Sequence, residues 1–219
     1  MSAPATATGS APSLSARIFG PVTDRQSYLN VLYLLLRFPL GIAYFTVFLT
    51  GIALGVSLLI LVVGVPILAF TLGLATYAAH FEARLTRRLL GIDVRYEPPD
   101  PTAEPLVAYL KAVLTEPQHY ILLGYFFATF GIGVASFVVV TVLFAFAGAL
   151  AVAPLTYWLP WVQFQITPTA TDAVGRIVID TLPEALVASV VGVGLFVASL
   201  HVCNGLAALF GRVTQAVLS

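Results

Sequence analysis

A run of 44 residues without a charged side chain constrains this chain more than any other feature. The run extends from Phe38 to Phe81. One membrane crossing needs about 20 apolar residues at 1.5 Å of helix each, so this run, about 66 Å of helix, is long enough for two crossings. The break between them falls at Gly64-Val65-Pro66, which predicts transmembrane helices at about 40–63 and 66–90.

Two further charge-free runs predict two more crossings. Pro117–Thr171 holds a third helix at about 131–153, and Ala185–Gly211 is the fourth. The composition agrees, because 59% of the 219 residues are apolar, only 9% are charged and the mean hydropathy is +0.98. A soluble domain carries about 25% charged residues. We therefore expect an all-α membrane protein with four transmembrane helices, and the zero net charge gives no reason to expect a nucleic-acid partner.

The basic residues predict how the protein lies in the cell membrane. Nine of the ten Lys and Arg residues fall in segments assigned to one side, and only Arg176 falls on the other. Cytoplasmic segments of membrane proteins are enriched in Lys and Arg, so both termini are expected in the cytoplasm. Residues 1–16, rich in Ala, Ser, Thr and Pro, are expected to be a disordered tail and lack the features of a targeting peptide.

The two halves of the chain resemble each other. TDRQSYLNVLYLLLRFPLGIAYF (Thr23–Phe45) aligns at an offset of 92 with TEPQHYILLGYFFATFGIGVASF (Thr115–Phe137), and ARLTRRLLG (Ala83–Gly91) resembles GRVTQAVLS (Gly211–Ser219). Shared apolar composition is the alternative explanation, but it does not account for the polar matches. We therefore predict two parallel repeats. They occupy 17–92 and 115–219, joined by a linker and short helix at 93–114, and an outer loop at 154–184 interrupts the second.

Each repeat is expected to begin with an amphipathic helix in the membrane interface, at about 24–38 and 116–130. A Thr–acid pair precedes each helix, as an N-cap and a first-turn carboxylate would. Phe-Pro-Leu-Gly and Phe-Gly-Ile-Gly then weaken the helix at the same register, where the chain would turn into the bilayer. The expected interfacial anchors are Tyr28, Tyr33, Arg37, Tyr120 and Tyr125.

Arg37 has two interpretations. It is expected to snorkel at the cytoplasmic boundary, so it need not be buried. The alternative is a buried charge on an ion path, which is disfavoured because Thr129 occupies the equivalent place in the second half.

On these segments the chain resembles the "putative sensor" transmembrane domain found at the N-terminus of many haloarchaeal and actinobacterial histidine kinases. The resemblance covers residues 17–219 and is carried by Phe19–Gly55, by LVVGVPIL (Leu61–Leu68), by EARLTRRLLGI (Glu82–Ile92) and by Leu200–Leu218. These motifs are structural, so they imply a fold more than a function. In that family a cytoplasmic kinase or other output module usually follows. The 219 residues contain no phosphoacceptor His segment or ATP-binding segment, so a stand-alone protein and a piece of a longer kinase both stay open.

Candidate ligand-binding residues lie in two places. Tyr157, Trp158 and Trp161 belong to the outer loop, either as an aromatic belt or as a lid over a ligand. His201 and Asn204 are three residues apart on the fourth helix and share a face. They form either an interhelical hydrogen-bonding pair or a ligand contact.

No cofactor, metal or catalytic residue is expected. A haem held by His80 and His201 is disfavoured because the two differ in depth by about 10 Å, and His201-x-Cys203 lacks enough further metal ligands. The known phosphate-loop, metalloprotease and nucleophile-elbow motifs are absent from the sequence. Gly51 and Gly55 form a GxxxG motif for helix packing, inside the bundle or in a dimer seam.

Three functions are compatible with these features. We favour a non-catalytic membrane sensor, as a homodimer, that responds to membrane lipids, membrane state or a hydrophobic ligand and signals to a cytoplasmic kinase or other output protein. The second is a structural subunit of a larger membrane complex. The third is a small lipid or solute carrier, which the scarcity of polar residues at mid-depth disfavours.

Overall fold

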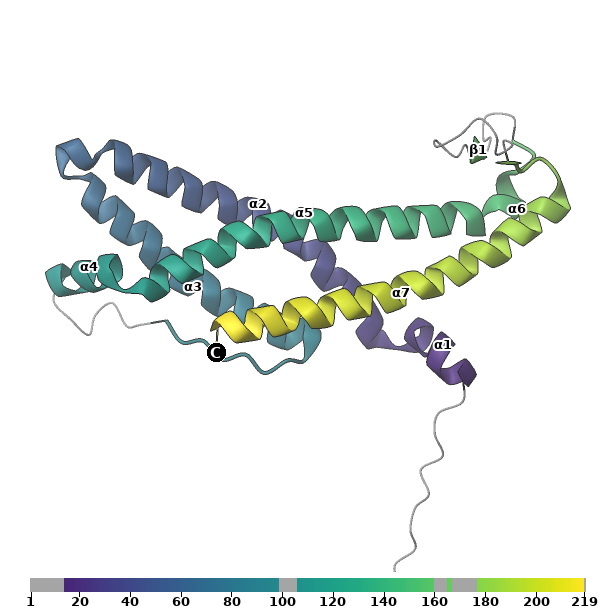
Figure 1. Ribbon diagram of the computed structural model, residues 1–219, viewed down its shortest axis with the longest axis horizontal. Helices are drawn as coiled ribbons and strands as arrows, with labels where there is room; N and C mark the ends of the chain where they lie inside the picture. The colour runs from purple at the N-terminus through teal and green to yellow at the C-terminus, as the bar shows by residue number, and fades with distance from the viewer. Residues whose placement is uncertain (1–13, 99–105, 160–164, 167–176, 219) are drawn as a thin grey trace, which may run out of the picture.

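The computed structural model describes residues 14–98, 106–159, 165–166 and 177–218 (Figure 1). Within them, the four helices long and apolar enough to cross a membrane are α2 (Arg25–Ser57), α3 (Gly64–Leu90), α5 (Pro117–Ala151) and α7 (Leu182–Leu218). This confirms the prediction of four apolar helices. The shorter elements are α1 (Leu14–Thr23), η1 (Leu59–Leu61), α4 (Leu106–Thr115), α6 (Ala153–Thr156) and the antiparallel pair β1 (Gln165–Ile166) and β2 (Ile177–Val178).

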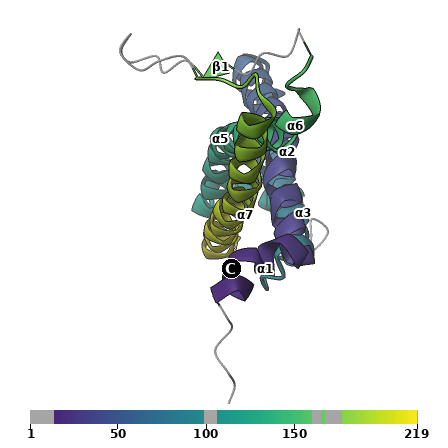
Figure 2. The same ribbon diagram turned by 90° about the vertical axis from the view of Figure 1, so that its right-hand side faces the viewer.

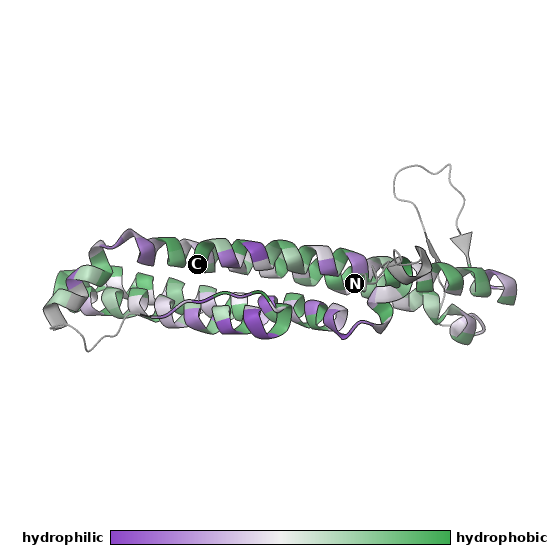
Figure 3. Ribbon diagram, turned by 90° about the horizontal axis from the view of Figure 1, so that it is seen from below, coloured by the Kyte–Doolittle hydropathy of each residue, from purple (hydrophilic) through white to green (hydrophobic). Residues whose placement is uncertain are grey.

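The long helices form two hairpins that cross near the middle of the molecule. The helices α2 and α3 make one hairpin and α5 and α7 make the other (Figures 1 and 2). The tips of the two hairpins lie at opposite ends of the long axis of the molecule (Figure 1). Apolar residues run along all four helices (Figure 3). Many of them are exposed, such as Phe70 of α3 and Val190 of α7. In a bilayer such side chains face lipid, while each helix satisfies its own backbone hydrogen bonds.

The predicted break between the first two crossings is a tight turn. Val62 takes the left-handed conformation with φ of 63° at the end of η1, and α3 then begins at Gly64. Pro66 lies in the first turn of α3, where a missing backbone N–H removes no helical hydrogen bond. The GxxxG motif serves this same hairpin, because Gly51 lies against Thr71 and Gly55 against Leu68.

The prediction of separate interfacial helices at 24–38 and 116–130 is wrong. The helix α2 runs without interruption through Pro39, and α5 runs through Gly131 and Gly133. A proline inside a helix removes one backbone hydrogen bond, and membrane helices tolerate this loss where neighbouring helices pack around it. The predicted caps are one residue off: the N-cap of α2 is Asp24, whose carboxylate accepts a hydrogen bond of 2.9 Å from the Gln26 backbone N–H, and not Thr23. The N-cap of α5 is Glu116, whose side chain makes no capping hydrogen bond.

The hairpins cross where two glycines let the backbones of α2 and α5 approach. A Cβ on Gly133 would lie 2.5 Å from the Arg37 carbonyl oxygen, and one on Gly41 would lie 2.9 Å from the Phe130 Cα. Two stacked aromatic pairs flank this contact. Phe38 stacks on Phe137 and Phe45 stacks on Phe130, with ring centroids 4.5 and 4.6 Å apart. Residues 92 positions apart thus make reciprocal contacts across the crossing.

The linker that follows α3 packs along the end of α7. Gly91 ends α3 in the left-handed conformation, with φ of 69°. Val94 is fully buried in the same apolar cluster as Leu218, and the Gln215 side-chain amide donates a 3.2 Å hydrogen bond to the Asp93 carbonyl oxygen. The linker therefore connects the cytoplasmic ends expected for α3 and α7.

Candidate functional site

Seven polar side chains from all four long helices meet inside the bundle, and we call them the polar cluster. The helices contribute Tyr33, Arg37 and Tyr44 from α2, Glu82 and Thr86 from α3, Tyr125 from α5 and Thr214 from α7. Residues four apart lie on the same face of a helix, which is how one face of α2 presents Tyr33 with Arg37, and one face of α3 presents Glu82 with Thr86.

An ion pair lies at the centre of the polar cluster. The Arg37 Nη2 and the Glu82 Oε1 are 3.2 Å apart, and the two side chains are only 2% and 1% exposed. Arg37 also donates hydrogen bonds to the hydroxyls of Tyr33 at 2.7 Å and Tyr125 at 3.0 Å, and at 3.5 Å to Thr214. The Arg37 side chain, which belongs to α2, therefore contacts residues of the other three long helices.

Glu82 also accepts hydrogen bonds from two tyrosine hydroxyls. Tyr44 donates to its Oε2 at 3.3 Å, and Tyr125 donates to its Oε1 at 3.5 Å. The rings of Tyr33 and Phe210 lie 5.1 and 5.6 Å from the Arg37 guanidinium carbon, within cation–π range. Among the residues that the structure describes, the Arg37 Nε is buried without a hydrogen-bond partner.

The buried ion pair costs free energy to form, and alternative hydrogen-bond partners lie close to it. Taking one ion of such a pair out of water costs several kcal/mol, and attraction offsets this only where geometry and extra hydrogen bonds are good. The hydroxyls of Tyr33, Tyr125, Thr86 and Thr214 lie within 3.0 to 3.5 Å of one another in pairs. A small helix shift can therefore exchange hydrogen-bond partners without leaving the charges unpaired.

Residues at equivalent positions of the two halves surround the ion pair. Tyr33 and Tyr125 are 92 apart, while Thr86 and Thr214 are 128 apart, which is the offset of the matching helix ends. Each tyrosine hydroxyl pairs with one threonine, at 3.5 Å and 3.0 Å. The two charges break this pattern, since Thr129 and Phe210 stand at the positions equivalent to Arg37 and Glu82.

The depth of the ion pair follows from counting along the helices. Twenty residues separate Arg37 from Ser57 at the end of α2, and 18 separate Glu82 from Gly64 at the start of α3. These distances are about 30 and 27 Å of helix, close to the thickness of the hydrocarbon core. With the turn at 58–63 at one membrane surface, the ion pair lies near the opposite surface.

The prediction that Arg37 snorkels to water is wrong, because its side chain is buried. Its side chain turns into the bundle toward Glu82, and does not snorkel to water. Tyr33 and Tyr125 are likewise buried in the polar cluster, whereas Tyr28 and Tyr120 are about half exposed and donate to the carbonyl oxygens six residues before them.

Glu82 was missed by the sequence reasoning, although a signal was present. Arg37 and Glu82 are the two residues that bound the 44-residue charge-free run. When such a run folds as a hairpin of two crossings, its ends return to the same membrane surface. Opposite charges at the two ends of a hairpin therefore indicate an ion pair.

The residues proposed as ligand contacts lie in separate places. Trp158 follows α6, is 67% exposed and donates to the Leu155 carbonyl oxygen, and Tyr157 packs on a small apolar cluster there. Trp161 lies outside the described residues. His201 and Asn204 lie 19 and 22 residues into α7, about 29 to 33 Å from its start.

Both members of the α7 pair bond to other helices. The Asn204 side chain donates to the Ser27 hydroxyl and accepts from the Asn30 amide, both at 2.9 Å, and a His201 ring nitrogen lies 3.0 Å from the Ile18 carbonyl oxygen. His80 contacts the Tyr96 carbonyl oxygen. Over the described part of the chain, no group of three His, Cys, Asp or Glu side chains could hold a metal ion.

Comparison with known proteins gives one match. A family model described as "Putative sensor" matches residues 33–218, a region that contains the whole polar cluster. No curated protein and no solved structure matches the chain.

Proposed function

We propose that this chain, which belongs to the "Putative sensor" family, is a non-catalytic membrane sensor that converts a change in the bilayer into a movement of α7. The observation that carries the proposal is the Arg37–Glu82 pair, which is buried in the bundle and touches all four long helices. Ionisable residues inside membrane proteins are rare and mark functional sites. A polar cluster with several nearby partners is also a suitable two-state element.

The route to the cytoplasm begins at Thr214, four residues before the end of α7. Thr214 contacts both Arg37 and Tyr125, so a change in the angle between the two hairpins alters its hydrogen bonds. The same end of α7 holds the linker through Gln215 and Leu218. A displacement of α7 therefore also moves the linker that packs against its end.

Three further features belong to this proposal. The reciprocal contacts at the crossing support a duplication of a two-helix unit, with both termini in the cytoplasm as the basic residues predict. The sensor acts as a homodimer, and a cytoplasmic kinase or other output protein reads the end of α7. The stimulus is the surrounding lipid, because the hairpin tips expose apolar side chains such as Ile60 and Leu155.

Spin-label distances between the two hairpin tips test the proposal. Labels at Ile60→Cys and Leu155→Cys, in a Cys203→Ala background, would be measured by double electron–electron resonance in nanodiscs of short-chain and long-chain lipids. A sensor of membrane state is expected to change its distance distribution between bilayers, and the change should be lost in the Arg37→Met/Glu82→Leu variant. The same distribution in every bilayer would refute the proposal and favour the structural subunit.

A further inference from the structure

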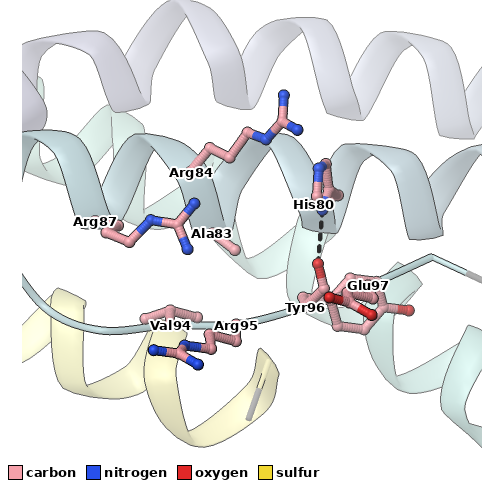
Figure 4. Close-up of a pocket in the computed structure, with 8 residues that line it drawn as sticks. All are labelled: His80, Ala83, Arg84, Arg87, Val94, Arg95, Tyr96 and Glu97. Carbon is pink, nitrogen blue, oxygen red and sulfur yellow. Dashed lines mark hydrogen bonds between the residues drawn. The ribbon is translucent and has the colours of Figure 1, made fainter.

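A second polar site lies next to the polar cluster, where the linker passes the cytoplasmic end expected for α3. It is a pocket of about 160 Å³ (Figure 4). Its lining consists of His80, Ala83, Arg84 and Arg87 from α3 and Val94, Arg95, Tyr96 and Glu97 from the linker. One wall is fixed to the helix, because His80 Nδ1 lies 2.6 Å from the Tyr96 carbonyl oxygen.

The residues that line the pocket carry an excess of positive charge. They include three arginines and one acidic residue, Glu97, and the Arg84 guanidinium extends to the side of α3 away from the linker (Figure 4). Arg95 also meets Asp93 at 3.3 Å, but both side chains are more than 60% exposed, so this ion pair contributes little. Within the described residues, Arg84 and Arg87 form no ion pair.

The depth of the pocket matches the headgroup layer. Arg84 lies 20 residues after Gly64, which is about 30 Å of helix and the thickness of the hydrocarbon core. Arginine presents a planar fork of donors that suits phosphate oxygens. Basic pockets at the cytoplasmic end of transmembrane helices are suited to the headgroups of anionic lipids.

We propose that this basic site binds a phosphate group, that of an anionic phospholipid, with Arg87 of α3 as the nearest donor on the linker side and Arg84 and Arg95 adding positive charge around it. Ala83, which lines the pocket, follows Glu82 directly, so an occupant touches the helix that carries half of the ion pair. Val94, which also lines it, packs with Leu218 of α7. The binding stands by itself, whereas its effect on α7 rests on the proposed function.

Native mass spectrometry of the full chain, released from nanodiscs of phosphatidylcholine with or without phosphatidylglycerol, tests the proposal. The variant is Arg84→Gln/Arg87→Gln. Arg88→Gln is the matched control, because Arg88 lies on the same exposed end of α3 but does not line the pocket. A second arm measures the thermal stability of each protein in detergent with inorganic phosphate.

The proposal expects the amount of retained phosphatidylglycerol to fall about tenfold or more in the double variant and less than twofold in the control. The reason is that each arginine near the membrane surface contributes about a fivefold preference for anionic lipid. Stabilisation by inorganic phosphate, lost only in the double variant, would support the phosphate site with a soluble source. The proposal would be overturned if the Arg88→Gln control lost as much bound phosphatidylglycerol as the double variant. It would also be overturned if the double variant lost neither phosphatidylglycerol nor stabilisation by inorganic phosphate. These outcomes do not depend on the spin-label distances, so the two proposals can fail separately.

Discussion

Replacing Glu82 with glutamine tests whether the buried ion pair holds the bundle in one arrangement. Glutamine has nearly the same shape and can still accept a hydrogen bond from Tyr44, so the change removes the negative charge with little change in packing. Arg37 then remains 2% exposed with its charge uncompensated. Its remaining hydrogen bonds go to the neutral hydroxyls of Tyr33, Tyr125 and Thr214.

The expected loss in the free energy of unfolding is about 3 kcal/mol, because removing one partner of a buried pair destabilises proteins by about 3–5 kcal/mol and the three hydroxyls offset part of this. The double variant Arg37→Met/Glu82→Leu removes both charges. It should lie within about 1 kcal/mol of the unaltered protein, since apolar replacements of buried pairs are often neutral or stabilising.

Equilibrium unfolding in mixed micelles of dodecyl maltoside and dodecyl sulfate, followed by circular dichroism, measures both values. Arg88→Gln, an exposed change on the same helix, should shift the free energy by less than about 0.5 kcal/mol. A Glu82→Gln variant as stable as the Arg88→Gln control would show that the pair does not act as described. The same conclusion would follow if the double variant lost as much free energy of unfolding as Glu82→Gln, or more.

Three further outcomes follow from the packing. Gly133→Ala should destabilise the bundle by about 1–3 kcal/mol in the same unfolding assay, because its Cβ would meet backbone atoms of α2, whereas Gly131→Ala, with nothing within 4 Å, should be neutral or stabilising. Asn204→Ala should cost about 0.6–1.7 kcal/mol by removing two interhelical hydrogen bonds, while the exposed His201→Ala should cost less; equal losses would contradict this reading. Cys203 is fully buried, so it should react with a maleimide only after unfolding, as mass spectrometry can show.

The sequence predicts the four long helices well, because the bilayer imposes a strong constraint on their length and composition. A charge-free run must span about 30 Å, and the turn at 58–63 is marked by Gly64 and Pro66. The start of α2 is also marked locally, although the capping side chain is Asp24 and not the predicted Thr23.

The break expected at Pro39 shows where local reasoning fails. A proline or a pair of glycines weakens a helix by a few kcal/mol, but Gly41 and Gly133 are also what lets α2 and α5 touch. The close packing at the crossing keeps both helices continuous. Weak local propensity and a close tertiary contact use the same residues, and the sequence alone does not separate them.

The burial of Arg37 required knowledge of a partner 45 residues away. A single arginine near a membrane boundary can snorkel or pair, and the choice depends on whether an acid faces it at the same depth. Thr129 stands at the position equivalent to Arg37 in the second half, which indicates that the two halves do not share a charge there. The ion pair is instead asymmetric, built by one half inside a framework of tyrosine and threonine residues from both.

The length of α7 gives small motions a mechanical advantage. Its backbone meets α5 closely at Gly192 near the far tip, and 26 residues of unbroken helix follow to Leu218. That arm is about 39 Å long, so a tilt of about 10° about Gly192 carries its end by about 7 Å. A bilayer that changes the opening of the hairpins only slightly would thereby move the end of α7 by more than the rise of one helical turn, which is about 5.4 Å.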